Sequence, residues 1–274
     1  MKALQDYFVL SNGVKIPKIG FGTWQIPNSE AYDATLEALK AGYIHIDTAE
    51  GYRNEEAIGR ALKDSGRTDV FVTSKLQSHN KGYDVTKEAF KETLENLQLD
   101  VLDLFLIHAP WPWDEIGKEC TKENIESWKA MVDLYKEGKI RSIGVSNFSI
   151  SDIQALIDAT GFVPHVNQIK YHIGDTSDAL VEYCKQNKIL IEAYSPLATG
   201  RILENESLVS MAKAKDVTVA QLCIRYCLEK DTLPLPKTTK LSRMIENADV
   251  DFSLSADELK QLDALSNLDG RRKG

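Results

Sequence analysis

The sequence predicts an α/β protein, a single (β/α)8 TIM-barrel domain spanning residues 1–274, with an N-terminal β-hairpin closing the bottom of the barrel. Short apolar runs alternate with amphipathic segments eight times, which implies parallel strands joined by crossover helices. The runs are continuously apolar, as expected for strands buried on both faces. Eight such units in about 250 residues fit a closed barrel better than an open sheet.

Eight strands are expected at 19–24, 43–47, 70–75, 102–108, 142–145, 163–168, 189–193 and 232–236. The last is the least regular, because Pro234 and Pro236 lie in it and proline removes hydrogen-bond donors from a strand ladder. Before the first strand, residues 7–10 and 14–16 flank Asn12-Gly13, a pattern typical of a β-hairpin. We expect this hairpin to cover the bottom of the barrel.

Helices are expected between the strands, because apolar residues recur there at every third or fourth position. The clearest stripes are Tyr32, Leu36 and Leu39; Ile58, Ala61 and Leu62; Ile125, Trp128, Val132 and Tyr135; and Ile153, Leu156 and Ile157. Each ends at a glycine (Gly42, Gly66, Gly138 and Gly161). Asn54 is expected to cap the second of these helices and Ser149 or Ser151 the fourth, and 219–228 reads as an extra helix.

Composition narrows the class of protein. The chain carries 33 basic and 41 acidic residues, a net charge of −8, which disfavours nucleic acid and anionic membranes as partners. Its apolar runs are shorter than the ~18 residues of a membrane helix, and its first residues lack the apolar core of a signal peptide. Four cysteines without C-x-x-C spacing read as reduced thiols. We expect a cytoplasmic monomer that acts on a small molecule.

Polar and aromatic side chains follow the predicted strands. In a barrel of this kind the C-terminal strand ends meet at one mouth, where chemistry takes place. The residues at or just beyond those ends are Trp24, Asp47 with Tyr52, Lys75, His108, Ser146 with Asn147, Gln168, Tyr194 and Lys237. Nearly all of them can exchange a proton, form hydrogen bonds or stack on a ring.

Four of these residues form a set that can donate a proton. A tyrosine hydroxyl has a pKa of ~10, and a nearby ammonium group lowers it. We expect Lys75 to lower the pKa of Tyr52 and Asp47 to hold that lysine. His108 would orient a carbonyl oxygen beside the tyrosine, so that the carbonyl is protonated as its carbon receives hydride. Each residue also has a purely structural reading: a loop cap, a surface aromatic, a lysine along an apolar wall and a core histidine.

The sequence offers no metal set. H-E-x-x-H is absent, and His45-Ile46-Asp47 supplies only half of the H-x-H of barrel metallohydrolases. We therefore place His45 deeper in the barrel, as a satisfied core histidine. The Rossmann pattern is absent too, because Gln25 stands where Gly20-Phe21-Gly22 would need a third glycine. A nicotinamide cofactor is then expected to lie across the barrel mouth.

Candidate cofactor contacts fall into two groups. The ring of Tyr194 can stack on a nicotinamide, and the side chains suited to its carboxamide are Ser146, Asn147 and Gln168. Cations and hydroxyls of 237–240, together with Arg243, concentrate at the last strand end and predict an anion site. The basic tail at 271–273 is read as solvated charge.

Over residues 8–269 the chain resembles the aldo-keto reductase superfamily. The motifs that carry the resemblance are Gly20-Phe21-Gly22-Thr23-Trp24, His45-Ile46-Asp47-Thr48-Ala49 with Tyr52 and Asn54-Glu55, Thr73-Ser74-Lys75-Leu76, Leu106-Ile107-His108, Gly144-Val145-Ser146-Asn147-Phe148, Val166-Asn167-Gln168, Ala193-Tyr194-Ser195-Pro196-Leu197, and Pro236-Lys237-Thr238-Thr239 with Arg243 and Glu246-Asn247. The compact length resembles the prokaryotic branch that includes 2,5-diketo-D-gluconate and glyoxal reductases.

The resemblance implies a (β/α)8 fold, NADP(H) as the cofactor and a catalytic tetrad, which falls on Asp47, Tyr52, Lys75 and His108. It also implies that Ser146, Asn147 and Gln168 hold the carboxamide and that Tyr194 stacks on the nicotinamide. The remaining implied cofactor contacts are Ser195 and Leu197 along the pyrophosphate, Lys237, Thr238 and Arg243 at the 2′-phosphate, and Asn247 at the adenine.

One motif departs from the family pattern. His-Trp-Pro reads His108-Ala109-Pro110 here, so the tryptophan that commonly walls the substrate pocket is absent. Trp111 or Trp113 is expected to replace it, and the predicted substrate contacts are Trp24, Tyr52, His108 and Trp111. We expect NADPH-dependent reduction of an aldehyde or ketone to an alcohol. Two alternatives stay open: a Schiff-base lyase with Lys75 as nucleophile, and a nucleotide-sensing subunit with little turnover.

Overall fold

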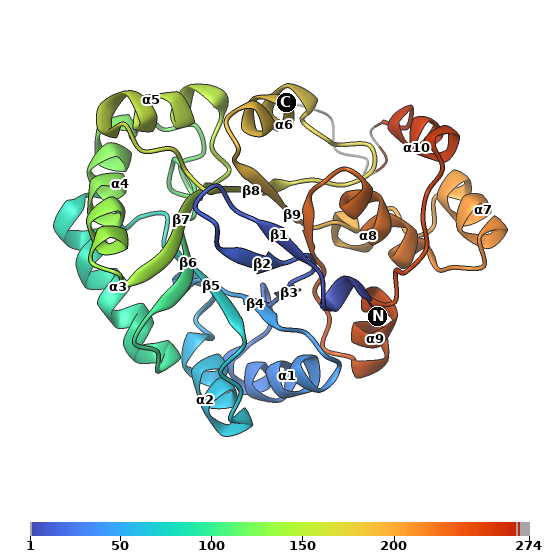
Figure 1. Cartoon of the computed structure of the whole chain (residues 1–274), viewed down its shortest axis with the longest axis horizontal. Coiled ribbons are helices and arrows are strands. Elements are labelled where there is room, and N and C mark those ends of the chain that lie inside the picture. The colour runs from blue at the N-terminus through green and yellow to red at the C-terminus, as the bar shows by residue number, and fades with distance from the viewer. Residues whose placement is uncertain (1, 267, 269–274) are drawn as a thin grey trace.

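The computed structural model describes residues 2–266 and 268. Eight parallel strands form a nearly closed barrel in which each strand is hydrogen-bonded to its neighbours in sequence order (Figure 1). These strands are β3 (Phe21–Gly22), β4 (His45–Asp47), β5 (Phe71–Leu76), β6 (Leu102–Ile107), β7 (Ile140–Ser146), β8 (Val166–Lys170), β9 (Leu190–Tyr194) and β10 (Leu233–Leu235). Each coincides with one of the eight predicted strands, so the barrel architecture is confirmed.

Helices surround the strands (Figure 1). They are α1 (Asn28–Lys40), α2 (Glu55–Ser65), α3 (Tyr83–Leu97), α4 (Thr121–Lys136), α5 (Ile150–Thr160), α6 (Asp178–Gln186), α7 (Glu206–Ala214), α8 (Val219–Glu229), α9 (Leu241–Ala248) and α10 (Ala256–Asp263). The extra helix expected at 219–228 is α8, which a reciprocal capping box of Thr218 and Gln221 begins. Within the described residues, none of these helices is long and apolar enough to cross a membrane.

The two predicted N-caps have different outcomes. Ser149 caps α5, and its hydroxyl accepts the backbone N–H of Asp152 in a capping box. Asn54 stands at the N-cap position of α2, but its side chain does not cap the helix. Its amide donates to the carbonyl oxygens of Thr23 and Ile26, at 3.1 and 3.0 Å. The prediction of a side-chain cap was therefore wrong, because Asn54 instead ties α2 to the loop that follows β3.

The two faces of the barrel sheet carry separate apolar clusters. On β6, Phe105 and Ile107 belong to the large cluster that packs against the helices. Leu104 and Leu106 belong to a smaller one, because side chains alternate across a strand. This smaller cluster fills the barrel interior with Phe71, Leu104, Leu106, Val166, Leu233 and Leu235, and we call it the apolar layer.

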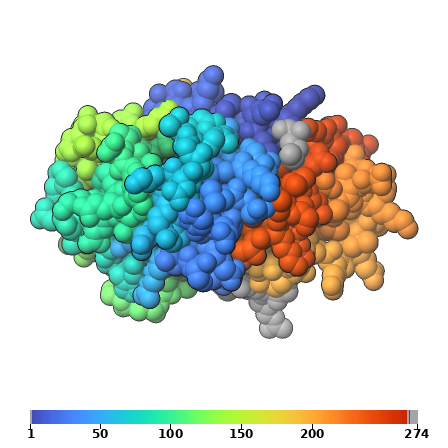
Figure 2. Space-filling view, turned by 90° about the horizontal axis from the view of Figure 1, so that it is seen from below, coloured from blue at the N-terminus to red at the C-terminus, as the bar shows by residue number. Residues whose placement is uncertain are grey.

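The N-terminal hairpin pairs β1 (Tyr7–Val9) with β2 (Lys15–Pro17) in antiparallel register. Its side chains Leu10 and Ile16 pack into the apolar layer, so the hairpin seals that end of the barrel as predicted. In Figure 1 it lies across the barrel opening that faces the viewer. The space-filling view shows it in dark blue at the margin of the molecule, beyond the blue and cyan helices (Figure 2).

The seam between β10 and β3 explains the glycines and prolines there. The amides of Gly20 and Gly22 donate to the carbonyl oxygens of Pro234 and Pro236, at 3.1 and 3.0 Å. The prolines thus close the seam with their carbonyl groups and need no N–H there. A Cβ on Gly20 would lie 2.5 Å from a methyl group of Leu235, so this approach requires glycine.

Candidate active site

Lys75 and Asp47 form a buried ion pair at the C-terminal ends of two neighbouring strands. The Lys75 Nζ donates to both carboxylate oxygens of Asp47, at 2.9 and 2.8 Å, and to the carbonyl oxygen of Thr48 at 2.7 Å. The Lys75 side chain is fully buried. Burial by itself would lower the pKa of Lys75, but Asp47 together with Tyr52 and Glu192 outweighs burial, so the pKa is raised. Lys75 is therefore an ammonium group fixed by its partners, and not a lysine lying along an apolar wall.

Tyr52 brings its hydroxyl to this ion pair. It ends a short 3-10 helix, η2 (Glu50–Tyr52), and the Lys75 Nζ lies 5.0 Å from the centre of its ring. Burial raises the pKa of the Tyr52 hydroxyl, while the positive charge of Lys75 lowers it. The expected lowering effect of Lys75 is present, and burial of the hydroxyl is a larger, opposing effect that leaves the pKa raised.

His108 follows the last residue of β6 and completes the set. Its ring makes edge contacts with the rings of Tyr52 and Trp113, with ring centres 5.5 and 5.9 Å apart. Burial and then the charge of Lys75 lower the pKa of His108 to about 3. The imidazole is therefore neutral near pH 7 and offers one N–H donor to a carbonyl oxygen. The structure thus brings together the four residues of the predicted set.

An aromatic wall extends from His108 toward solvent. The rings of Trp111 and Trp113 meet edge to face at 4.9 Å, and Trp113 contacts His108. The backbone amide of Trp113 donates to the Ser78 hydroxyl at 3.3 Å, which ties the wall to the loop after β5. Trp113 and Trp24 are both exposed, at 43% and 46%. The sequence left Trp111 and Trp113 open as the replacement for the missing tryptophan and named Trp111 as a substrate contact. In the structure the ring of Trp113 contacts His108. The substrate role of Trp111 stays a prediction.

The four residues expected around the carboxamide also lie together. The Ser146 hydroxyl donates to the carbonyl oxygen of Gln168 at 2.9 Å. Asn147 has a left-handed backbone with φ of 62°, which asparagine tolerates. Its amide donates to the carbonyl oxygen of His108 at 3.1 Å, and its side-chain oxygen accepts the Tyr194 hydroxyl at 2.8 Å. Asn147 thereby links the strand ends of β6, β7 and β9.

The predicted phosphate and adenine contacts occupy two segments. Ser195 and Leu197 follow β9 and are half-buried. The others lie at the start of α9 or within it: Lys237 and Arg243 are exposed, and Thr238 and Asn247 are buried. No side chain of the described part caps the N-terminus of α9, so its amides and these cations suit an anion. The basic tail at 271–273 lies outside the described residues.

His45 lies deeper in the barrel than Asp47, as expected, but it is not fully satisfied. Its Nε2 lies 2.9 Å from the Thr73 hydroxyl, while Nδ1 has no hydrogen-bond partner among the described residues. Nδ1 lies near Gly20, because a Cβ on that glycine would come within 2.7 Å of it. The described residues contain no cluster of three or more His, Cys, Asp or Glu side chains that could hold a metal ion.

Glu192 is a residue that sequence reasoning passed over. It lies on β9, fully buried, and one of its carboxyl oxygens lies 3.9 Å from the Nε2 of His45. Its signal was an acidic residue inside an otherwise apolar strand, two positions before Tyr194 and therefore on the same face. Glu192 thus belongs to the polar interior of the barrel together with Lys75 and Asp47.

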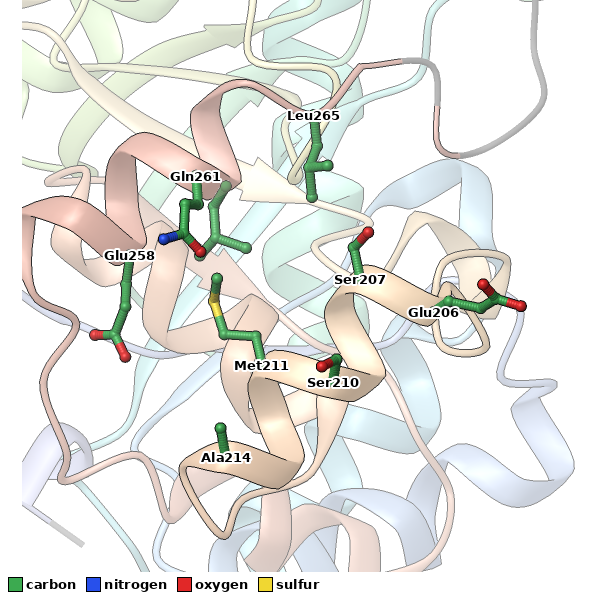
Figure 3. Close-up of a pocket in the computed structure, with 9 residues that line it drawn as sticks. Glu206, Ser207, Ser210, Met211, Ala214, Glu258, Gln261 and Leu265 are labelled. Carbon is green, nitrogen blue, oxygen red and sulfur yellow. The ribbon is translucent and has the colours of Figure 1, made fainter.

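A surface groove between α7 and α10 lies apart from these residues (Figure 3). It has a volume of about 700 Å³ and is lined by Glu206, Ser207, Ser210, Met211, Ala214, Glu258, Gln261, Leu262 and Leu265. None of the candidate site residues lines it. The chemistry therefore belongs to the strand ends.

A buried lysine–carboxylate pair touching a tyrosine, with a histidine beside it at a barrel mouth, defines a candidate proton-donating enzyme. Residues 18–267 match the model of the Aldo/keto reductase family. The chain belongs to this family, so the predicted membership is confirmed and the chain is an oxidoreductase.

Relatives and solved structures agree with this assignment. The glyoxal reductase of Bacillus subtilis (strain 168) is 42% identical over 268 residues, covering 96% of this chain and 94% of that protein. Methylglyoxal reductase DkgA of Escherichia coli (strain K12) is 39% identical over 270 residues, covering 97% of this chain and 94% of its own. A crystal structure of a Gox0644 mutant in complex with NADPH superimposes with a TM-score of 0.90 at 37% identity, covering 98% of this chain and 96% of that one.

Proposed function

We propose that the protein reduces an aldehyde or ketone to an alcohol with NADPH, with Tyr52 as the proton donor. The observation that carries this proposal is the buried ammonium of Lys75, which two oxygens of Asp47 hold and whose Nζ lies 5.0 Å from the centre of the Tyr52 ring. The reaction class is that of the family, an NADP-dependent carbonyl reduction. Bound NADPH supplies the hydride that reduces the carbonyl carbon.

The protein's own side chains orient the carbonyl group and supply the proton. The neutral imidazole of His108 donates an N–H to the carbonyl oxygen and holds it beside the Tyr52 hydroxyl. Tyr52 then gives its proton to that oxygen. The Lys75 ammonium stabilises the phenolate that remains, and Asp47 keeps the ammonium in place.

The donors and acceptors of the barrel mouth suit a nicotinamide nucleotide. Ser146, Asn147 and Gln168 lie together beside Tyr194, which suits a carboxamide-bearing ring. Ser195 and Leu197 follow β9 directly after Tyr194 and are half-buried, which suits contacts to a pyrophosphate. The exposed cations Lys237 and Arg243 flank the start of α9, with Thr238 and Asn247 buried beside them, and this set suits a 2′-phosphate and an adenine.

The substrate we propose is a small dicarbonyl compound of the glyoxal type. The support is the 42% and 39% identity to reductases named for glyoxal and methylglyoxal. The wall of Trp111 and Trp113 and the exposed ring of Trp24 would border the entrance. A panel of dicarbonyl, aliphatic and aromatic aldehydes, followed by loss of NADPH absorbance, ranks these substrates directly.

Replacing Tyr52 by phenylalanine tests the proton donor. Tyr52→Phe removes one hydroxyl and keeps the ring that contacts His108. We expect kcat to fall by about 10²–10⁴-fold, the contribution typical of a positioned acid, while the dissociation constant of NADPH stays within about twofold. Steady-state kinetics and quenching of tryptophan fluorescence measure the two quantities. Retention of most of the turnover would show that another group donates the proton.

Replacing Arg243 by alanine tests the phosphate site. We expect Arg243→Ala to raise the dissociation constant of NADPH by about tenfold or more and that of NADH by less than about twofold. The reason is that a charge-assisted bond to the 2′-phosphate is lost only for NADPH. Isothermal titration calorimetry with both nucleotides measures this difference. Equal losses for the two nucleotides would rule out a contact to the 2′-phosphate.

The two alternatives have less support. A Schiff-base lyase needs an unprotonated lysine, whereas Asp47 and Thr48 bind the Lys75 ammonium and its pKa is raised. Borohydride trapping of a substrate adduct on Lys75 would favour the lyase. A nucleotide-sensing subunit would keep the same residues, and slow NADPH oxidation across the whole carbonyl panel would favour it.

We also infer that the protein works in the cytoplasm as a monomer with one barrel domain over 1–274. The four cysteines are free thiols and buried, which suits a reducing compartment. Sedimentation velocity measures the oligomeric state.

A further inference from the structure

The barrel interior holds a carboxyl group that the proton-donating set does not use. Glu192 is fully buried on β9, next to Gln168 on the neighbouring strand β8 in the parallel register. Its Oε2 accepts a hydrogen bond of 2.8 Å from the Gln168 Nε2. Its Oε1 has no hydrogen-bond partner within the part of the chain that the structure describes.

Glu192 and Asp47 together fix the amide of Gln168. The Gln168 Nε2 donates to the Asp47 Oδ1 and to the Glu192 Oε2, both at 2.8 Å. An amide nitrogen carries two hydrogens, so both of its donors are used. The orientation of the amide is therefore set, with its Oε1 turned away from the two acids. No group among residues 2–266 and 268 donates a hydrogen bond to that Oε1.

An acceptor held in this way suits the NH₂ of a carboxamide. We propose that Glu192 is a positioning residue for the nicotinamide, which acts by holding Gln168 so that its Oε1 accepts from the carboxamide NH₂. The inference rests on the proposed function, because it takes the nicotinamide to lie beside Tyr194 and Gln168. Glu192 is then the second acceptor that holds the Gln168 amide. The first is Asp47, whose Oδ1 also accepts a hydrogen bond from Lys75.

The groups around Glu192 explain why a carboxyl group is tolerated there. Asp47 and His45 face it from β4, Lys75 and Thr73 belong to β5, and Gln168 approaches from β8. Burial and then the charge of Asp47 raise the pKa of Glu192, which favours its neutral form. A neutral Glu192 leaves Lys75 and Asp47 as a balanced pair. A protonated carboxyl still accepts the Gln168 N–H through its carbonyl oxygen.

Two variants of Glu192 separate positioning from mere packing. Glu192→Leu keeps a side chain of similar size but removes the acceptor, so one N–H of Gln168 is left unpaired in a buried site. Glu192→Gln keeps both the size and an acceptor oxygen, and is the matched control. Adenosine 2′,5′-bisphosphate is the second control, because it carries the 2′-phosphate of NADPH but no nicotinamide.

We expect Glu192→Leu to raise the dissociation constant of NADPH by about tenfold, the effect of one lost hydrogen bond. The dissociation constant of adenosine 2′,5′-bisphosphate should stay within about twofold. Glu192→Gln should bind both ligands like the unmodified protein. Quenching of tryptophan fluorescence gives the dissociation constants of both ligands for the two variants and the unmodified protein, and thermal unfolding confirms that each variant is folded. Unchanged NADPH binding in Glu192→Leu, or an equal loss for both ligands, overturns the proposal. If the leucine variant does not fold, Glu192→Met takes its place.

A double-mutant cycle tests whether the effect passes through Gln168. Gln168→Leu removes the acceptor that Glu192 positions, so adding Glu192→Leu to it should weaken NADPH no further. Additive losses would overturn the inference. A failure of the proposed function would look different, because the unmodified protein would then neither bind NADPH nor oxidise it with any carbonyl compound.

Discussion

The barrel interior has two halves that are built from the same strands but have opposite chemistry. Toward the hairpin, Phe71, Val166 and Leu190 fill the space with hydrocarbon. Two or four residues further along the same strands, Lys75, Gln168 and Glu192 fill it with hydrogen-bonded polar groups. Inward positions recur every second residue, so the change occurs within one or two steps of about 7 Å.

The difference shows how the fold separates stability from chemistry. The apolar layer removes hydrocarbon from water, which stabilises the fold by about 25 cal/mol for each Å² that is buried. The polar half adds little to the free energy of unfolding, because the cost of burying Lys75 and Asp47 offsets most of their attraction. Burial of the apolar layer therefore offsets the unfavourable free energy of burying the charges of the polar half. Substitutions in the polar half should therefore lower kcat, whereas those in the apolar layer should lower only the free energy of unfolding.

The largest effect is expected at Lys75. Lys75→Met removes the ammonium and leaves Asp47 buried without its counter-charge. We expect kcat to fall by at least about 10²-fold, and the free energy of unfolding to fall by about 3–5 kcal/mol, the cost typical of breaking a buried pair. Carbonyl reduction assays and urea denaturation measure the two effects.

The matched control replaces both partners. In Asp47→Asn/Lys75→Met no charge is left unpaired, so most of the lost stability should return while activity stays absent. If the double variant were as unstable as Lys75→Met, the ion pair would contribute to stability itself, and the separation between the two halves would fail.

A substitution in the apolar layer should have the reverse signature. Leu104 is fully buried and lies on β6 in the layer that the hairpin covers. Leu104→Ala should lower the free energy of unfolding by about 2–5 kcal/mol through lost burial and a cavity. Under conditions where the variant is folded, kcat and KM should stay within about twofold. A large fall in kcat would show that the lower half also positions the catalytic groups.

The smallest effect concerns His45, which lies between the two halves. Burial and then Lys75 lower its pKa from 6.5 to about 3, so the folded state holds it neutral. Below pH 6.5 the unfolded chain binds a proton that the folded chain does not. Stability from this group is therefore complete above pH 6.5 and is lost as the pH falls toward 3, by about 1.4 kcal/mol per pH unit.

His45→Gln cannot take up that proton and removes this contribution. The difference in unfolding free energy between the variant and the unmodified protein should therefore shrink as the pH falls from 6.5 to 4.5. Urea denaturation at several pH values measures it, and His108 contributes equally to both proteins. A constant difference would show that His45 is protonated in the folded state.

The strands, and the clustering of Asp47, Tyr52, Lys75 and His108, were predictable from the sequence because local patterns determine them. Apolar runs placed all eight strands, and strand ends placed Asp47, Lys75 and His108 at one mouth. Pattern alone could not show the side-chain partners. Asn54 looks like a helix cap, yet its amide bonds to two loop carbonyls that are distant in the sequence.

Three-dimensional burial accounts for the other differences. The pKa of Tyr52 depends on how deeply its hydroxyl is buried, which spacing does not reveal. Glu192 was visible as an acid in an apolar strand, but its link to Gln168 and Asp47 joins three strands that are far apart in the chain. Likewise, two tryptophans only two positions apart gave no sign that the ring of Trp113 would contact His108.

The seam between β3 and β10 has a consequence for how the molecule comes into being. The amides of Gly20 and Gly22 find their acceptors only on Pro234 and Pro236, which a ribosome makes more than two hundred residues later. During synthesis the growing chain cannot complete the ring, and the Lys75–Asp47 pair stays accessible to water. Exclusion of solvent from the Lys75–Asp47 pair is therefore one of the last events in the biogenesis of this protein.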